Sequence, residues 1–173
     1  MSGVTAARWV ALARRPSGFP TGADFRIEDI PIPPCPPGGL LLEYLWLSLE
    51  PYIRGRMGDT ASYSPPMPIG DAMVGRTISR VLQSDNANFV AGDVVIPQGG
   101  WQTHTVSDRE GLRRLPRGLA QPTLALGPLG APGFAAHIGV RDIGRVSAGE
   151  TRLVLAAARP VGATAVQIKA SSR

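Results

Sequence analysis

The stretch from Leu40 to Met57, LLLEYLWLSLEPYIRGRM, carries the strongest signal for the fold. Its first part, up to Leu49, is a long and almost entirely apolar run. Such a run predicts a strand that is buried along most of its length. Proline cannot donate a hydrogen bond to a strand ladder, so Glu50-Pro51 is expected to end the strand. Pro51 also favours the start of a helix, and a short helical turn is predicted over residues 52–56.

Both sides of this stretch have the turn residues of a strand-rich domain. The 173 residues include 21 glycines and 17 prolines without a periodic repeat, which favours short strands joined by tight turns. Gly75 interrupts one strand pattern and indicates either a bulge or a close approach of the backbone. Strands are expected at residues 9–13, 25–30, 40–49, 73–82, 94–96 and 101–106. Together they predict a mainly β domain over residues 1–125.

The pattern changes in the last third of the chain. The elements expected there are helices at 119–129 and 132–140, a strand at 152–156 and a helix at 161–168. A strand, a turn of small residues and a helix begin a βαβ unit, which needs a second parallel strand. Only the polar tail 170–173 follows. Residues 126–173 are therefore expected to form linker helices and an incomplete α/β unit, cut off from a longer protein.

The composition excludes several classes of protein. The net charge is +5, but the 18 basic residues are scattered. The densest group, between Arg109 and Arg117, lacks interleaved aromatic residues, so a nucleic-acid-binding β-barrel would rest on charge alone. The single cysteine, Cys35, excludes an internal disulfide framework. The sequence shows neither a signal peptide nor an apolar run of about 18 residues, so a cytoplasmic protein without a membrane partner is expected.

Several segments resemble those of a known family. Leu47 to Met57 is close to the signature LSxDPYMRGRM, and further similar segments follow in the same order at 73–75, 92–95, 99–102, 126–136 and 149–162. These segments are similar to the zinc-independent medium-chain dehydrogenase/reductase family, in the branch of prostaglandin, alkenal and curcumin reductases. The resemblance implies a GroES-like β domain (residues 1–125) followed by the start of a Rossmann domain that binds NADP.

The resemblance also implies a reaction. In this branch, NADPH gives hydride to the β-carbon of an α,β-unsaturated carbonyl, and the α-carbon is then protonated. The expected partner is a small enone or alkenal, and a homodimer is compatible with the family. The family's carbonyl-polarising tyrosine matches no residue of this chain, so no catalytic residue is assigned. The isolated chain is expected to be inactive and not to hold NADPH on its own.

The same resemblance assigns binding residues. Tyr52 matches the tyrosine that lines the pocket for nicotinamide and substrate, although a half-buried aromatic residue at a strand end is the alternative. Ala135 stands where the family has a threonine that contacts the nicotinamide amide. The nucleotide loop is matched by Pro160, Val161, Gly162 and Ala163, with Arg159 in place of a glycine.

Three further points concern metals, anions and alternatives. Cys35, His104 and His137 are too few for either zinc site of the zinc-dependent relatives, so no metal is expected. Arg54 and Arg56 suggest an anion site or, alternatively, two solvated arginines beside a glycine turn. If the chain is not part of an enzyme, it is expected to be a catalytically dead remnant that acts as a binding or oligomerisation module.

Overall fold

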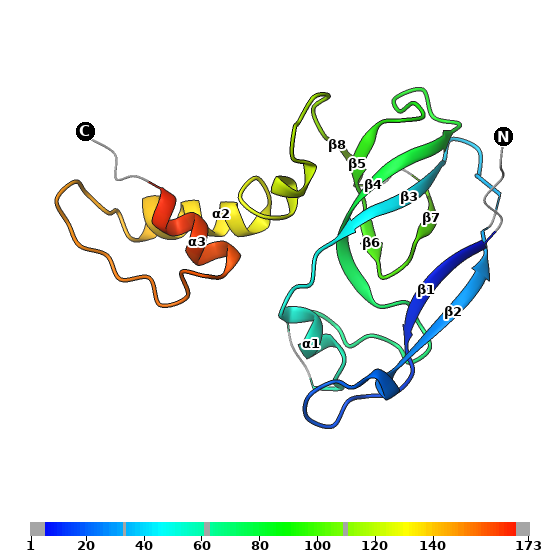
Figure 1. Cartoon of the computed structure of the whole chain (residues 1–173), viewed down its shortest axis with the longest axis horizontal. Coiled ribbons are helices and arrows are strands. Elements are labelled where there is room, and N and C mark those ends of the chain that lie inside the picture. The colour runs from blue at the N-terminus through cyan, green and yellow to red at the C-terminus, as the bar shows by residue number, and fades with distance from the viewer. Residues whose placement is uncertain (1–5, 33, 61–62, 109–110, 169–173) are drawn as a thin grey trace. The chain divides into compact units, whose positions relative to one another are not determined.

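The computed structural model describes residues 6–32, 34–60, 63–108 and 111–168 (Figure 1). The expected polar tail 170–173 and Arg109 lie outside these residues. The chain divides into two compact units between Leu119 and Ala120, and each unit is described by itself.

The first unit begins with a two-stranded antiparallel sheet. Strands β1 (Ala6–Leu12) and β2 (Phe25–Pro31) pair along their whole lengths, as the alternating sequence predicted. A 3₁₀ turn over Gly22–Asp24 precedes β2. The buried carboxylate of Asp24 accepts hydrogen bonds from the Thr21 N–H and the Arg14 guanidinium, both at 2.7 Å. These bonds fix the connection between the two strands.

A larger antiparallel sheet follows, in the order β7-β3-β4-β5-β8, with β6 also paired to β4. Its strands are β3 (Leu40–Leu47), β4 (Val74–Ser84), β5 (Val94–Ile96), β6 (Gln98–Gly100), β7 (His104–Ser107) and β8 (Arg113–Arg114). Backbone hydrogen bonds join the two sheets: Val10 donates to the Trp101 carbonyl, and Met73 donates to the Val10 carbonyl, both at 2.8 Å. Figure 1 shows these strands together in one β-rich unit, with helix α1 (Tyr52–Arg56) at one end.

The interior of this unit contains two clusters of buried apolar side chains. The cluster beside α1 consists of Leu12, Ile53, Met57, Met67 and Met73. The second cluster consists of Leu40, Leu42, Val81 and Val95. The fully buried leucines of β3 confirm the prediction from the apolar run, although β3 ends at Leu47 rather than at residue 49.

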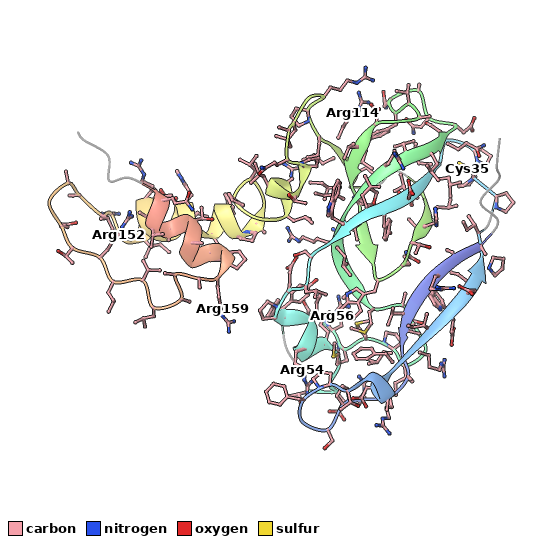
Figure 2. The ribbon with its side chains drawn as sticks, viewed as in Figure 1. Cys35, Arg54, Arg56, Arg114, Arg152 and Arg159 are labelled. Carbon is pink, nitrogen blue, oxygen red and sulfur yellow. The ribbon has the colours of Figure 1, made fainter. Side chains whose placement is uncertain are left out.

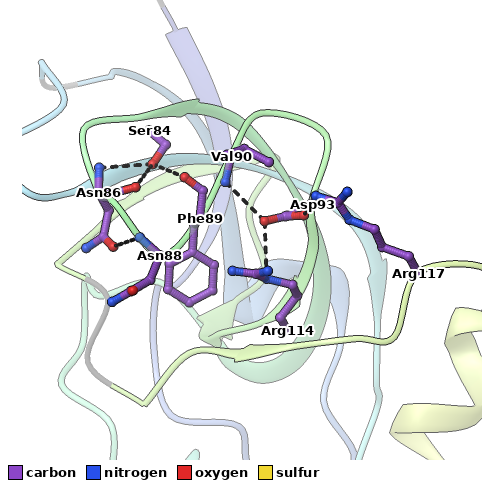
Figure 3. A network of polar contacts seen from close by, with 8 residues as sticks. All are labelled: Ser84, Asn86, Asn88, Phe89, Val90, Asp93, Arg114 and Arg117. Atoms are coloured by element: carbon purple, nitrogen blue, oxygen red, sulfur yellow. Dashed lines mark hydrogen bonds and ion pairs between the residues drawn. The ribbon is translucent and has the colours of Figure 1, made fainter.

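A network of polar contacts surrounds Asp93 (Figure 3). The Asp93 carboxylate, whose side chain is 1% exposed, accepts a hydrogen bond from the Val90 N–H at 3.0 Å. It also pairs with Arg114 and Arg117, each at 3.2 Å. The Arg114 guanidinium lies 5.1 Å from the centre of the Phe89 ring. One buried carboxylate therefore holds a turn and two arginines together.

The second unit is helical. It contains a 3₁₀ helix (Pro122–Leu126), α2 (Ala131–His137), a π-helical turn (Ile138–Ile143) and α3 (Pro160–Gln167). Helices α2 and α3 pack against each other. A Cβ at Gly133 would lie 1.7 Å from the Pro128 carbonyl oxygen, so α2 requires glycine there.

Three sequence predictions need correction. The helix expected over 119–129 is only the 3₁₀ helix, because Pro122 fixes its start and Gly127-Pro128 ends it. The strand expected over 101–106 is limited to β7, because Trp101 lies outside β7, with its ring stacked on Phe25.

The third correction concerns the strand expected over 152–156, which the structure does not form. A strand is defined by backbone pairing, and the described residues offer this segment no neighbouring strand. Leu153 and Leu155 are 85% and 91% exposed. Arg152 instead donates to the carbonyls of Val166 and Ile168, at 3.3 and 2.5 Å, and so caps the C-terminus of α3.

Candidate functional site

Helix α1 positions Tyr52 at its first residue. Ile53 and Met57 lie one turn apart on the buried face of the segment and anchor it in the core. The half-buried Tyr52 packs against the same cluster, and its ring centre lies 6.4 Å from that of Tyr63. The short helix predicted from Pro51 is therefore confirmed, and it gives Tyr52 a fixed place.

Three arginines tie α1 to the loops around it. Arg15 donates to the carbonyls of Met57 and Gly58 at 3.0 and 2.7 Å, where the helix ends. Arg54 donates to the Gly18 carbonyl at 2.6 Å. Arg56 donates to the carbonyl of Pro65, 2.9 Å away. Figure 2 shows Arg54 and Arg56 on α1. Each of these three arginines therefore donates at least one hydrogen bond to a backbone carbonyl. The two alternatives for Arg54 and Arg56, an anion site and two solvated arginines, did not include such bonds.

An open groove of 670 Å³ lies beside this helix. Its lining is mostly apolar and consists of Gly18, Phe19, Pro20, Leu49, Glu50, Pro51, Ile53, Arg54, Met57 and Trp101. Tyr52 is not among these lining residues, although both of its chain neighbours are. A contact between Tyr52 and a substrate therefore stays a prediction.

Trp101 is one of the two aromatic residues that line this groove, with Phe19. Its ring stacks on Phe25 with 5.9 Å between centres and 24° between planes. A Cβ at Gly75 would lie 3.3 Å from Trp101 Nε1 and 2.7 Å from Leu47 Cδ1. Gly75 pairs in regular register with Gly99, so the close approach, rather than the bulge, explains this glycine.

Sequence reasoning did not select Trp101 or Phe19 as site residues. The available signals were the Gly-Gly-Trp sequence at 99–101 and an aromatic residue set between Gly18 and Pro20.

The predicted cofactor residues lie in the second unit. Arg159 is the N-cap of α3 with extended backbone (φ −96°, ψ 157°), and Pro160 is the first helical residue. Pro160 has no N–H, and the Ala163 N–H bonds to the Arg159 carbonyl at 2.7 Å. The N–H groups of Val161 and Gly162 therefore belong to the first turn, where a helix offers no carbonyl partner. These two donors at the positive end of the helix fit an anionic group, whereas the exposed Arg159 adds bulk as well as charge.

Gly162 allows close packing at the start of α3. A Cβ at Gly162 would lie 2.1 Å from the Ala156 carbonyl oxygen. This glycine therefore permits the turn before α3 to pack against the helix, which is the part that a third glycine plays in dinucleotide-binding loops. Pro160, Val161, Gly162 and Ala163 are brought together at one helix start, as predicted from the sequence.

Ala135 lies on α2, exposed, and its methyl group offers no hydrogen bond. His137, at the end of the same helix, is also exposed. His104 lies on β7, half-buried, with Nδ1 3.0 Å from Thr103 Oγ1. Within the described parts of the chain, no three His, Cys, Asp or Glu side chains gather in a way that could hold a metal.

The family model for the N-terminal domain of oxidoreductases matches residues 8–115. The chain belongs to this family. The NADPH-dependent curcumin reductase of Escherichia coli (strain K12) is 47% identical to this chain over 161 residues, covering 93% of the chain and 46% of that protein. Prostaglandin reductase 1 of Rattus norvegicus is 39% identical over 168 residues, covering 95% of the chain and 49% of that protein.

Solved structures give the same result. CurA from Vibrio vulnificus, solved in complex with NADPH, is 41% identical, with a TM-score of 0.86 over 92% of this chain and 48% of that one. A putative NADPH:quinone reductase from Bacillus thuringiensis, at 14% identity and a TM-score of 0.68, shares the fold. The chain spans about half the length of these relatives.

These comparisons confirm the predicted family and fold class. This chain has the mainly β, GroES-like domain followed by a helical unit, and it belongs to the branch of curcumin and prostaglandin reductases. Its relatives are NADP-dependent reductases. Among the described residues, no helix is long and apolar enough to cross a membrane.

Proposed function

We propose that this chain forms the substrate-binding part of an NADPH-dependent reductase that acts on the C=C bond of α,β-unsaturated carbonyls. The observation that carries the proposal is the apolar groove beside α1, in a chain that is 47% identical to an NADPH-dependent curcumin reductase. Small-molecule sites are typically concave and mostly apolar, with a few polar groups that set orientation. The groove has this character.

Each unit has its own part in the proposed reaction. Bound NADPH supplies the hydride. In the first unit, the groove holds the apolar tail of the enone. In the second unit, the N–H groups of Val161 and Gly162 would hold an anionic part of the cofactor. The carbonyl oxygen gains negative charge as hydride arrives, and an aimed donor would stabilise it. The chain supplies no catalytic residue that we can assign.

A chimera tests this proposal. The chain would replace the aligned segment of the Escherichia coli curcumin reductase, and consumption of NADPH would be followed with a simple alkenal and with a cyclic enone. The proposal expects turnover with at least one of them, and a KM that rises when Tyr52 is changed to phenylalanine if its hydroxyl contacts the substrate. A folded chimera that consumes no NADPH with any enone would count against the proposal.

A second candidate is a binding or oligomerisation module without activity. The observation in its favour is the exposed pair Leu153 and Leu155, both on a segment that pairs with no described strand. Such apolar side chains are typical of surfaces that another chain covers. Sedimentation velocity of the chain and of Leu155→Asp separates the candidates. A dimer that the substitution abolishes, together with an inactive chimera, would favour the module.

A further inference from the structure

The loop that follows β1 presents an aromatic residue to solvent. Phe19 is 95% exposed, between Gly18, which has a φ of +82°, and Pro20. Its backbone is held by the hydrogen bond from Arg54 Nη2 to the Gly18 carbonyl, at 2.6 Å. Phe19 and Arg54 both line the apolar groove. The position of this aromatic wall therefore depends on a side chain of helix α1.

The charged residues of the groove are both engaged by other parts of the protein. Arg54 bonds the Gly18 carbonyl, and the Glu50 carboxylate lies 3.7 Å from Arg76 Nε. The remaining wall includes Phe19, Leu49 and Trp101. Placing a charged ligand group against this apolar wall would cost desolvation free energy, whereas an uncharged apolar group would not have that cost. The groove is therefore matched to a neutral tail.

We propose that Arg54 is a positioning and specificity-determining residue, which fixes Phe19 as the outer wall of a subsite for the neutral aromatic or alkyl tail of the substrate. This inference rests on the proposed function, because it takes the enone as the occupant of the groove. Arg54 acts through the loop and touches no reacting atom. The tail is expected to be neutral, because apart from Glu50 and Arg54 the lining of the groove is apolar.

The test measures binding to the 173-residue chain without cofactor. Benzylideneacetone and its para-carboxylate form a matched pair of probes, and their Kd values are obtained by ligand-observed NMR titration. The neutral probe is expected to bind more tightly. Phe19→Ala and Arg54→Met should each weaken its binding by about five- to tenfold, the size of a typical anchoring contact. Arg54→Lys, which keeps one donor for the Gly18 carbonyl, should restore most of the affinity.

Two comparisons separate positioning from a general loss of structure. Arg56→Met removes the same charge from the same helix, but Arg56 bonds Pro65 and does not line the groove, so its Kd should equal that of the wild type. If Arg54 acts through Phe19, the double variant Phe19→Ala, Arg54→Met should bind no more weakly than Phe19→Ala alone. Thermal melting of each variant shows that the fold is kept.

Four results would overturn the inference: no binding of the neutral probe, tighter binding of the carboxylate, additive effects in the double variant, or equal weakening by Arg56→Met. The titration contains no NADPH, so these results count against the groove. A failure of the chimera to consume NADPH counts against the reductase proposal instead.

Discussion

The carbonyl oxygen of Ala156 lies against Gly162 so closely that a Cβ there would approach it to 2.1 Å. The neighbouring Ala157 nitrogen would lie 3.0 Å away. Both are backbone atoms, which cannot move out of the way by a rotamer change as the end of a long side chain can. The start of α3 and the turn before it therefore form one packed structure, and this structure holds the predicted cofactor residues.

Gly162→Ala is expected to break this packing. An inserted methyl group without room typically costs about 1–3 kcal/mol, and here it should fray the first turn of α3. Hydrogen exchange of the amides in residues 160–168 measures the effect. Gly139→Ala is the matched control, because a Cβ at Gly139 meets no atom within 4 Å. Equal protection in both variants would show that the close contact does not hold the helix.

Asp93→Asn should destabilise the first unit. The substitution keeps the shape but removes the charge that pairs with Arg114 and Arg117, and it weakens the acceptor for the Val90 N–H. Loss of a buried hydrogen-bonding group costs about 1–3 kcal/mol. Urea unfolding followed by tryptophan fluorescence is suited to this test, since Trp9, Trp46 and Trp101 all lie in this unit. Asp29→Asn, in an exposed pair with Arg8, should have a smaller effect.

The same carboxylate makes stability depend on pH. The Val90 N–H, followed by Arg117 and Arg114, holds the pKa of Asp93 below its ordinary value. A carboxylate with a lowered pKa stabilises the fold above its unfolded pKa of about 3.9, and this contribution is lost as the pH falls through the folded pKa. The difference in stability between wild type and Asp93→Asn should therefore narrow below about pH 4. A constant difference from pH 7 to pH 3 would contradict this cause.

The nucleotide loop is expected to bind NADPH weakly because of two residues. Arg159 places a long side chain where the family has glycine, and Pro160 removes one N–H from the first turn of α3. Arg159 has a negative φ, so bulk rather than backbone strain is the cause. In the chimera with curcumin reductase, the double substitution Arg159→Gly, Pro160→Ala should tighten NADPH binding by about tenfold, or ~1.4 kcal/mol. An unchanged Kd in a fluorescence titration would show that the loop tolerates both residues.

The 173-residue chain by itself should not turn over NADPH. Dinucleotides bind in the crevice of a sheet with several parallel strands, and segment 152–156 forms no strand in this structure. Loss of a single oxyanion donor already lowers a rate by about 10²–10³. The assay is NADPH absorbance with an alkenal and a cyclic enone, on protein shown to be folded by circular dichroism. Turnover that Tyr52→Phe abolishes would make Tyr52 catalytic and overturn this expectation.

The sequence predicted those elements whose signals are local. The alternation in β2, the apolar run of β3 and the proline before α1 all gave the correct type of structure. The strand predicted over 152–156 was wrong because strand formation does not depend on a local signal alone. An apolar run becomes a strand only when a neighbouring strand pairs with it. The sequence of these five residues does not show whether such a neighbouring strand is present.

The candidate site was only partly predictable. The position of Pro160 to Ala163 at a helix start followed from their motif. The groove did not, because Phe19, Leu49 and Trp101 come from three distant segments and meet only through the fold. The bond from Arg54 to the Gly18 carbonyl spans 36 residues of sequence, and no spacing rule indicates it.

The most direct test of the account asks which bond is reduced. The chimera would be given benzylideneacetone and NADPH that carries deuterium at the transferable position, and the product would be identified by NMR. The account predicts benzylacetone with deuterium on the carbon next to the phenyl ring, which is the β-carbon of the enone. The allylic alcohol with deuterium on the carbinol carbon would show carbonyl reduction instead, and it would contradict the proposal that this chain serves a reductase of C=C bonds.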